Sequence, residues 1–322
     1  MMKNGITIKK LAAFALALAM CAALLMGCAS PAKTEPVKLG TLMGPTGMGM
    51  VAIMGEEYAK EYDITVSSAP EDITAAFISG ELDMAAVPIN LASVLYNKLD
   101  GDVYMLAVNT LGVLYVLENG NEVNSMADLA GKTLYATGQG ATPEYIINYL
   151  LEKNGIAGEV SVEYKAEHSE LAALMASGEV TLGMLPQPNV TATLAKNAEL
   201  RIALDLTEEW GKVSDTQLVQ GCIIARRSFV EENKAVIATF LKDYEASVAF
   251  VNEHHEKASL LMETYGIIPS ASLAKAAIKK CNIVCLTGDD MAAAASGMLN
   301  VLFEVEPKSV GGALPDEELY YR

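Results

Sequence analysis

The chain has 322 residues, a formal net charge of −17 and 52% hydrophobic residues. This apolar content predicts a globular protein rather than a disordered one. The acidic balance argues against nucleic acid or an anionic lipid surface as a partner.

The N-terminal segment has the features of an export signal. Three lysines precede a long apolar run, which ends in Leu-Met-Gly-Cys at Cys28. This pattern predicts a secretory signal peptide over residues 1–27, and its ending resembles the lipobox of bacterial lipoproteins, in which the cysteine becomes the lipidated first residue. An uncleaved membrane anchor is the alternative, which the small residues just before Cys28 disfavour. Residues 28–37 then form a polar tether.

The mature chain is large enough for two domains of ordinary size. Removal of residues 1–27, which hold three lysines and no acid, leaves 295 residues with a net charge of −20. No second apolar run reaches the ~20 residues that a membrane span needs. The lipid on Cys28 is therefore expected to be the only membrane attachment.

A glycine-rich turn follows the first predicted strand. Residues 42–50 read LMGPTGMGM, with glycines at 44, 47 and 49. Glycine permits positive φ and lets a ligand approach the backbone closely, and the N–H groups at a helix start are available to an anion or a polar group. A flexible surface turn is the alternative.

Two segments of the chain repeat one pattern. Residues 75–88 read AAFISGELDMAAVP and residues 172–186 read AALMASGEVTLGMLP. The Ser-Gly-Glu triplet moves from position 79 to 177, a shift of 98, and Pro88 and Pro186 differ by the same shift. A strand and a glycine-rich turn precede each copy. Each unit therefore predicts strand, glycine turn, helix, strand, helix, strand and proline turn.

The second unit shows the helix signals most clearly. Thr142 is placed to cap a helix that opens with Pro143 and Glu144, and Gly155 is placed to end it. Strands that alternate with helices indicate a largely parallel sheet. Two such lobes side by side would form a cleft, with ligand beyond the carboxyl ends of the strands.

Two long β-rich stretches are expected to connect the lobes. Residues 102–120 would cross to the second lobe and residues 218–229 would return, with hinges near 108–114 and 215–222. The chain after the return is helical, since apolar residues keep helical spacing. These helices should complete the first lobe.

The domain prediction follows from the crossings. The first lobe comprises residues 38–110 and 220–322, and the second lobe comprises residues 111–219.

The whole pattern resembles the substrate-binding proteins of ABC importers. SGELDMAAVP at 79–88, the helical run from 226 to 251 and GGALPDEELYY at 311–321 are similar to the nitrate, sulfonate and taurine group, which includes thiamine-precursor binders. The resemblance implies a type II periplasmic-binding-protein-like α/β fold, with two lobes joined by two crossover strands around a ligand cleft. It also implies a monomeric, extracytoplasmic, lipid-anchored protein that passes a small solute to a permease and an ATPase.

Four turns should face the cleft, and none contains Lys, Arg, Asp or Glu. A small anion held by helix dipoles and hydroxyls is one possible ligand. A neutral heterocycle hydrogen-bonded by Asn90, Gln139 and Gln187 is the other. The predicted ligand-binding residues are Pro45, Thr46, Gly47, Met48, Pro88, Asn90, Gly138, Gln139, Gly140, Thr142 and Gln187.

An enzyme on the same scaffold is the second hypothesis. The resemblance allows a menaquinone-pathway enzyme or a pyrimidine synthase, but the cysteine-rich motif and histidine of the synthase have no match. His168, His254 and His255 are expected on solvated helices, and Trp210 either lies near the cleft rim or has a structural role.

The three cysteines of the mature fold, Cys222, Cys281 and Cys285, are expected to be buried thiols. The glycine turn lacks the Lys of a phosphate-binding loop. We therefore expect no catalytic residue, metal or cofactor.

Overall fold

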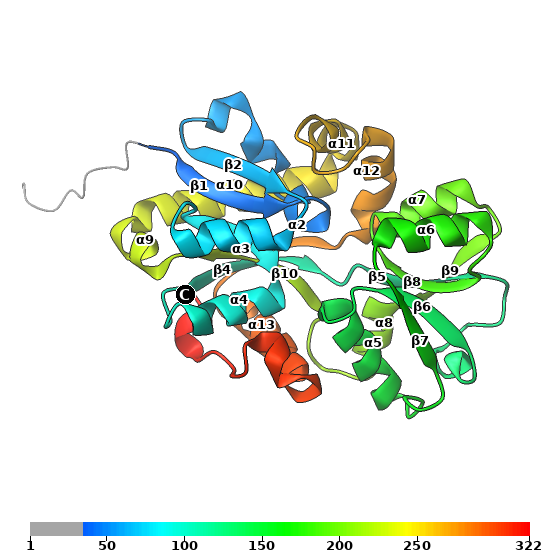
Figure 1. Cartoon of the computed structure of the whole chain (residues 1–322). Coiled ribbons are helices and arrows are strands. Elements are labelled where there is room, and N and C mark those ends of the chain that lie inside the picture. Colours follow the sequence, from blue (N-terminus) through cyan, green and yellow to red (C-terminus); the bar gives the residue numbers. More distant parts are fainter. Residues whose placement is uncertain (1–34) are drawn as a thin grey trace, which may run out of the picture. The chain divides into compact units, whose positions relative to one another are not determined.

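The computed structural model describes residues 35–322 (Figure 1). The predicted signal peptide and Cys28 lie outside the described residues. Residues 36–322 belong to one unit by their internal contacts. None of the helices in the described part is both long and apolar enough to cross a membrane.

The first sheet, called sheet A here, has six strands in the order β11-β4-β10-β3-β1-β2. The strands β1, β2 and β3 are parallel, and β10 pairs antiparallel with both β3 and β4. The strand bounds are β1 (Val37–Leu42), β2 (Tyr62–Ser67), β3 (Met84–Pro88), β4 (Tyr104–Leu111), β10 (Val219–Ala225) and β11 (Ile283–Leu286).

Helices cover both faces of sheet A because its strands are apolar on both faces. On β3, Ala85 and Val87 belong to the core cluster shared with α3 (Pro70–Ser79), α4 (Ile89–Lys98) and α13 (Gly288–Val305). Met84 and Ala86 belong to the opposite cluster, shared with α10 (Lys234–Glu253) and α11 (His255–Thr264).

Short elements complete this part of the chain. They are α2 (Pro45–Met48), η1 (Val51–Met54), η2 (Glu56–Tyr58), α9 (Arg227–Glu232), α12 (Ala271–Ala277), η4 (Ile278–Lys280), η5 (Pro307–Val310) and η6 (Glu317–Leu319).

The second sheet, sheet B, has five strands in the order β7-β6-β8-β5-β9. Its strands are β5 (Leu114–Asn119), β6 (Thr133–Thr137), β7 (Ser161–Lys165), β8 (Leu182–Pro186) and β9 (Leu200–Asp205). In Figure 1, α6 (His168–Ser177) and α7 (Asn189–Lys196) lie on one side of it, and α5 (Thr142–Lys153) and α8 (Leu206–Gly211) lie on the other. The 3-10 helix η3 (Met126–Leu129) precedes β6.

The two sheets repeat one topology, as the duplicated sequence predicts. In each sheet the strand next to one edge pairs in parallel with the two strands that follow it in the chain, β1 with β2 and β3, and β6 with β7 and β8. The helices α3 and α6 end at equivalent left-handed glycines, Gly80 with φ 81° and Gly178 with φ 82°. These glycines end the helices because residues with a Cβ are strained at such φ.

The chain passes between the sheets twice. Residues 112 and 113 join β4 of sheet A to β5 of sheet B, and residues 206–218 join β9 back to β10. The sequence analysis did not predict β11. This strand follows α10, α11 and α12 in the chain and forms an edge of sheet A by pairing with β4. The C-terminal helices also contact helices that flank sheet B, since α13 contacts α5 and α12 contacts α7.

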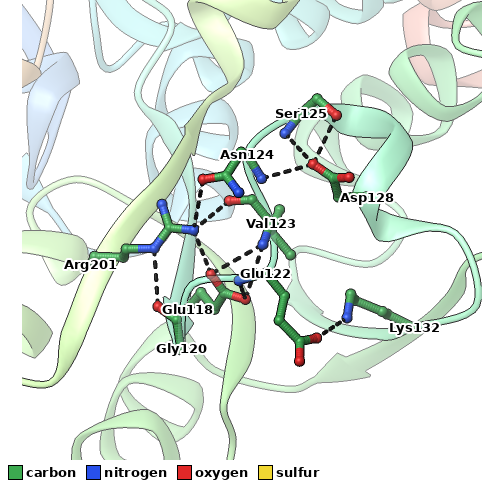
Figure 2. A network of polar contacts seen from close by, with 9 residues as sticks. All are labelled: Glu118, Gly120, Glu122, Val123, Asn124, Ser125, Asp128, Lys132 and Arg201. Atoms are coloured by element: carbon green, nitrogen blue, oxygen red, sulfur yellow. Dashed lines mark hydrogen bonds and ion pairs between the residues drawn. The ribbon is translucent and has the colours of Figure 1, made fainter.

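A polar network closes the end of sheet B (Figure 2). Arg201 donates to the Glu118 carboxylate at 2.6 Å and to the Val123 carbonyl at 2.5 Å. Glu118 pairs across the sheet with Leu182, at the start of β8. The network therefore lies at the opposite end of the strands from Pro186, where β8 ends.

Candidate functional site

A cavity of about 630 Å³ is lined by residues from both sheets. Its wall is formed by the turns that follow β1, β3, β6 and β8, the four turns that the sequence selects. Residues beside the two crossings, Thr110, Val113 and Gln220, also line it. The volume is within the range of roughly 300–1,000 Å³ typical of small-molecule sites.

Most of the predicted binding residues line this cavity. They are Pro45, Thr46, Pro88, Asn90, Gly138, Gly140, Thr142 and Gln187. Gly47, Met48 and Gln139 do not. Met48 is buried in the apolar core, and Gln139 is exposed. A Cβ on Gly47 would lie 2.4 Å from the Leu42 carbonyl oxygen, so this glycine allows close packing of the turn on its own strand.

Several backbone N–H groups of the glycine turns already have partners. Gly44 donates to the Ile267 carbonyl at 2.9 Å, and Gly47 donates to the Gly44 carbonyl at 3.0 Å. Gly140 donates to the carboxylate of Glu144 at 2.5 Å. These groups are used within the protein, so the turns offer a ligand fewer N–H donors than the sequence pattern predicts.

The prediction that Thr142 caps α5 is wrong. Ala141 is the N-cap residue and Thr142 is the first helical residue. The Thr142 hydroxyl instead donates to Asn90 Oδ1 at 3.3 Å, and Asn90 Nδ2 donates to the Ser309 carbonyl at 3.2 Å. A hydrogen bond thus joins α5 beside sheet B to α4 beside sheet A, at the wall of the cavity.

His168 lies on a helix, as the sequence predicts, but it is half-buried rather than fully solvated. It is the first residue of α6, it lines the cavity, and its Nδ1 lies 2.6 Å from the Thr137 hydroxyl. Burial lowers the pKa of His168 below its ordinary value, which favours the neutral ring at neutral pH. The duplication could have identified His168 as a residue of the cavity wall. Its equivalent, Pro70, lies 98 positions earlier, begins the equivalent helix and lines the same cavity.

Three buried polar atoms on the cavity lining have no hydrogen-bond partner within the described residues. They are Gln187 Nε2, Thr110 Oγ1 and Gln220 Nε2. Buried polar groups are normally paired, so such atoms indicate a bound water or a ligand. The sequence analysis selected Gln187 but missed Thr110 and Gln220, because these two lie inside predicted strands rather than in turns.

The charge on the cavity wall is low. Among the described lining residues none is Lys or Arg, and Glu71 is the one carboxylate. The first residues of α2, α3, α5, α6 and α7 and the second residue of α4 line the cavity, so six helix N-termini meet there. First-turn acids accompany three of these ends, on α3, α5 and α6.

Residues considered for chemistry lie elsewhere or are unreactive. Trp210 is 1% exposed, stacks near Tyr149 and donates to the Thr216 carbonyl, so its role is structural. Burial raises the pKa of the Cys222 thiol well above its ordinary value, which keeps it protonated. Within residues 35–322, no three His, Cys, Asp or Glu side chains gather as metal ligands.

A second cavity of about 600 Å³ lies along β2 and α3. Residues of sheet A and its helix form its wall, including Lys38, Asp63 and Asp72. It contains none of the predicted binding residues and touches only one sheet.

Comparisons with known proteins agree with this architecture. The model of the family described as NMT1/THI5 like matches residues 61–258, more than half of the chain. A search of curated proteins finds no match.

Solved structures share the fold. An ABC transporter structure from Parabacteroides distasonis has a TM-score of 0.76 at 23% identity, covering 89% of this chain and 99% of that one. The periplasmic aliphatic sulphonate binding protein SsuA from Escherichia coli has a TM-score of 0.72 at 16% identity, covering 89% and 92%. The periplasmic nitrate-binding protein NrtA from Synechocystis PCC 6803 has a TM-score of 0.54 at 13% identity, covering 78% and 69%. The fold is therefore the α/β fold of periplasmic binding proteins.

Proposed function

Because the chain belongs to the NMT1/THI5-like family, we propose that it binds a small solute outside the cytoplasm and delivers it to an ABC importer. Proteins of the same fold bind aliphatic sulphonates and nitrate. Candidate ligands are therefore a sulfonate-like or nitrate-like anion, or a thiamine-type pyrimidine.

The observation that carries this proposal is the cavity itself. Equivalent turns of two topologically equal sheets meet around one cavity. Three residues that line it, Gln187, Thr110 and Gln220, carry buried polar atoms without a partner among the described residues. A site shared between two sheets suits a protein that closes around its ligand, since movement of one half relative to the other opens or covers the cavity.

The proposed moving parts follow the two crossings. We assign residues 38–110 and 220–322 to the first lobe and residues 111–219 to the second. Residues 112 and 113 and residues 212–218 form the hinges, because the chain changes sheets at those places and α8 packs on sheet B. The hydrogen bond from Thr142 to Asn90 then belongs to a closed arrangement.

Binding without chemical conversion is part of the proposal. The titratable side chains on the cavity wall are His168 and Glu71. The first is kept neutral by burial, and the second is exposed. His168 is hydrogen-bonded to the Thr137 hydroxyl, but Thr137 is 1% exposed and does not line the cavity, so no base and nucleophile stand together on the wall as a covalent mechanism needs. The enzyme alternative therefore has no observation in its favour.

The proposed location rests on the sequence of the leader. Lipid on Cys28 would hold a monomeric binding protein at the outer face of the cell membrane, near the permease and ATPase. The variant Cys28→Ala should lose lipid attachment and leave the membrane fraction. Retention in the membrane, with cleavage at another residue, would contradict the lipoprotein assignment.

Solute binding is tested by a thermal-shift screen of sulfonates, nitrate-like anions and pyrimidines. A solute at ~100 times its dissociation constant should add about 2.7 kcal/mol of stability. The solute is then recovered after denaturation and analysed by mass spectrometry. Unchanged solute supports a binding protein, and a converted product would support the enzyme instead.

A further inference from the structure

The wall of the cavity carries a donor whose direction is fixed by its neighbours. Gln187 is 1% exposed. Its Oε1 accepts from the Thr191 hydroxyl at 2.8 Å and from the Thr191 N–H at 3.4 Å. Because an N–H can only donate, the oxygen of the Gln187 amide must face Thr191. The amide nitrogen is therefore the end without a partner among the described residues.

A second buried group lies on the same wall. Thr110 is 1% exposed, and its hydroxyl also has no partner within residues 35–322. An unpaired buried donor destabilises the fold, because it has given up its hydrogen bond to water without gaining another. A ligand with a hydrogen-bond acceptor, such as a carbonyl oxygen or a ring nitrogen, would satisfy Gln187, and the Thr110 hydroxyl can either donate or accept.

The cavity has little to hold a full negative charge. None of its described lining residues is Lys or Arg, and Glu71 adds a negative charge at the exposed edge. Anions do bind at helix N-termini without a basic side chain. An anion in this cavity would therefore have to be attracted by the helix N-termini that line it.

Three of the six helix ends are compensated by acidic side chains of the protein. The first turn of α3 carries Glu71 and Asp72, that of α5 carries Glu144 and that of α6 carries Glu170. Acids in the first turn offset the positive end of the helix dipole. Glu144 also takes the N–H of Gly140, which stands on the cavity wall. The other three, α2, α4 and α7, have no acid in the first turn, and α2 is only a single turn of four residues.

We propose that the cavity selects an uncharged solute that has an apolar body and an acceptor atom bound by Gln187 Nε2. This inference rests on the proposed function and narrows it to one charge class. The apolar body is accommodated by a wall rich in proline and aliphatic side chains, among them Pro45, Pro88, Pro186, Leu91 and Ile267. The proposed solute is therefore uncharged, whereas the sulphonate-binding and nitrate-binding proteins of the same fold are named for anions.

The test uses matched pairs of compounds with one carbon skeleton. Short alkanesulfonates are compared with the corresponding sulfonamides, and pyrimidine carboxylates with the corresponding carboxamides, at equal concentration in a thermal-shift assay. We expect the uncharged member of at least one pair to raise the melting temperature while its acid does not. The dissociation constant of that probe is then measured by calorimetry.

The variant Gln187→Glu tests the assigned donor. It keeps the side-chain volume and an oxygen that faces Thr191, but it replaces the amide donor with a carboxylate that repels an acceptor. We expect affinity for the uncharged probe to fall at least about tenfold. Asn121→Asp is the control, because it also replaces an amide with a carboxylate, at an exposed residue outside the cavity wall. Its affinity should remain within about twofold of the unmodified protein.

The outcomes separate this inference from the proposed function. Stabilisation by acids and not by their uncharged partners would overturn the inference and leave solute binding in place. Equal affinity of Gln187→Glu and Asn121→Asp for an uncharged probe would overturn the assignment of the donor. No stabilisation by any anion, pyrimidine or uncharged partner would contradict the proposed function, and the inference would fail with it.

Discussion

Arg201 should be the main stabiliser of the far end of sheet B. Its guanidinium bonds the Glu118 carboxylate at 2.6 Å, the Val123 carbonyl at 2.5 Å and the Gly120 carbonyl at 3.1 Å (Figure 2). These contacts tie β5 and β9 to the loop that precedes η3. The variant Arg201→Met removes all of them and retains most of the side-chain stem.

The magnitude follows from the burial of the partner. Glu118 is 5% exposed, and removal of Arg201 leaves its carboxylate with only the N–H groups of Glu122 and Val123, at 3.0 and 3.1 Å. Breaking a fully buried pair costs about 3–5 kcal/mol. The side chain of Arg201 is 31% exposed, so water screens the pair and we expect a loss of about 2–3 kcal/mol.

The assay is urea denaturation monitored by circular dichroism. Arg201→Met should lower the midpoint without changing the slope, since the same surface is exposed on unfolding. Ligand affinity should not change, because the network lies at the opposite end of the strands from the cavity. Lys212→Met is the control, since Lys212 makes a more exposed ion pair with Glu209 and should cost less than about 1 kcal/mol. A loss no larger than in the control would refute the reasoning.

Three further variants test the cavity region. Thr142→Val should speed amide exchange at the starts of α4 and α5 about two- to fivefold, because it removes one hydrogen bond of about 0.5–1 kcal/mol to Asn90. Thr142→Ser keeps the hydroxyl and should leave the exchange rates unchanged, so equal exchange in the two variants would contradict this. The folded protein should lose stability as the pH falls below about 6.5, the ordinary pKa of histidine. The unfolded chain then binds a proton at His168, which the lowered pKa disfavours in the folded protein. The melting temperature of His168→Gln should lose that part of the pH dependence, and an unchanged profile would contradict this. Gly47→Val should lower the melting temperature even without ligand, because its Cβ would approach the Leu42 carbonyl; an unchanged melting temperature would contradict this.

The duplicated pattern allowed much of the architecture to be predicted from the sequence. The shift of 98 positions between the two Ser-Gly-Glu triplets implies equal topology, and Gly80 and Gly178 occupy equivalent helix ends. The same periodicity located the turns around the cavity. Local signals of this kind are strong because glycine at positive φ has few substitutes.

The features that the sequence missed depend on contacts between distant segments. Thr142 satisfies the rules for a helix cap, yet its hydroxyl bonds Asn90, which lies 52 residues away. The sequence around His168 is that of a solvated helix start, and its contact with Thr137 and its place on the cavity wall become visible only in the fold. The strand β11 pairs with β4 across more than 170 residues, since Ile283 lies opposite Thr110. No local pattern contains these partners.

The most direct test of the account is a crystal structure with the stabilising solute from the matched pairs. The account predicts density in the cavity between the turns of the two sheets, with an acceptor atom within hydrogen-bond distance of Gln187 Nε2. Density in the second cavity, beside Lys38 and Asp63, with the cavity between the sheets unchanged, would contradict it.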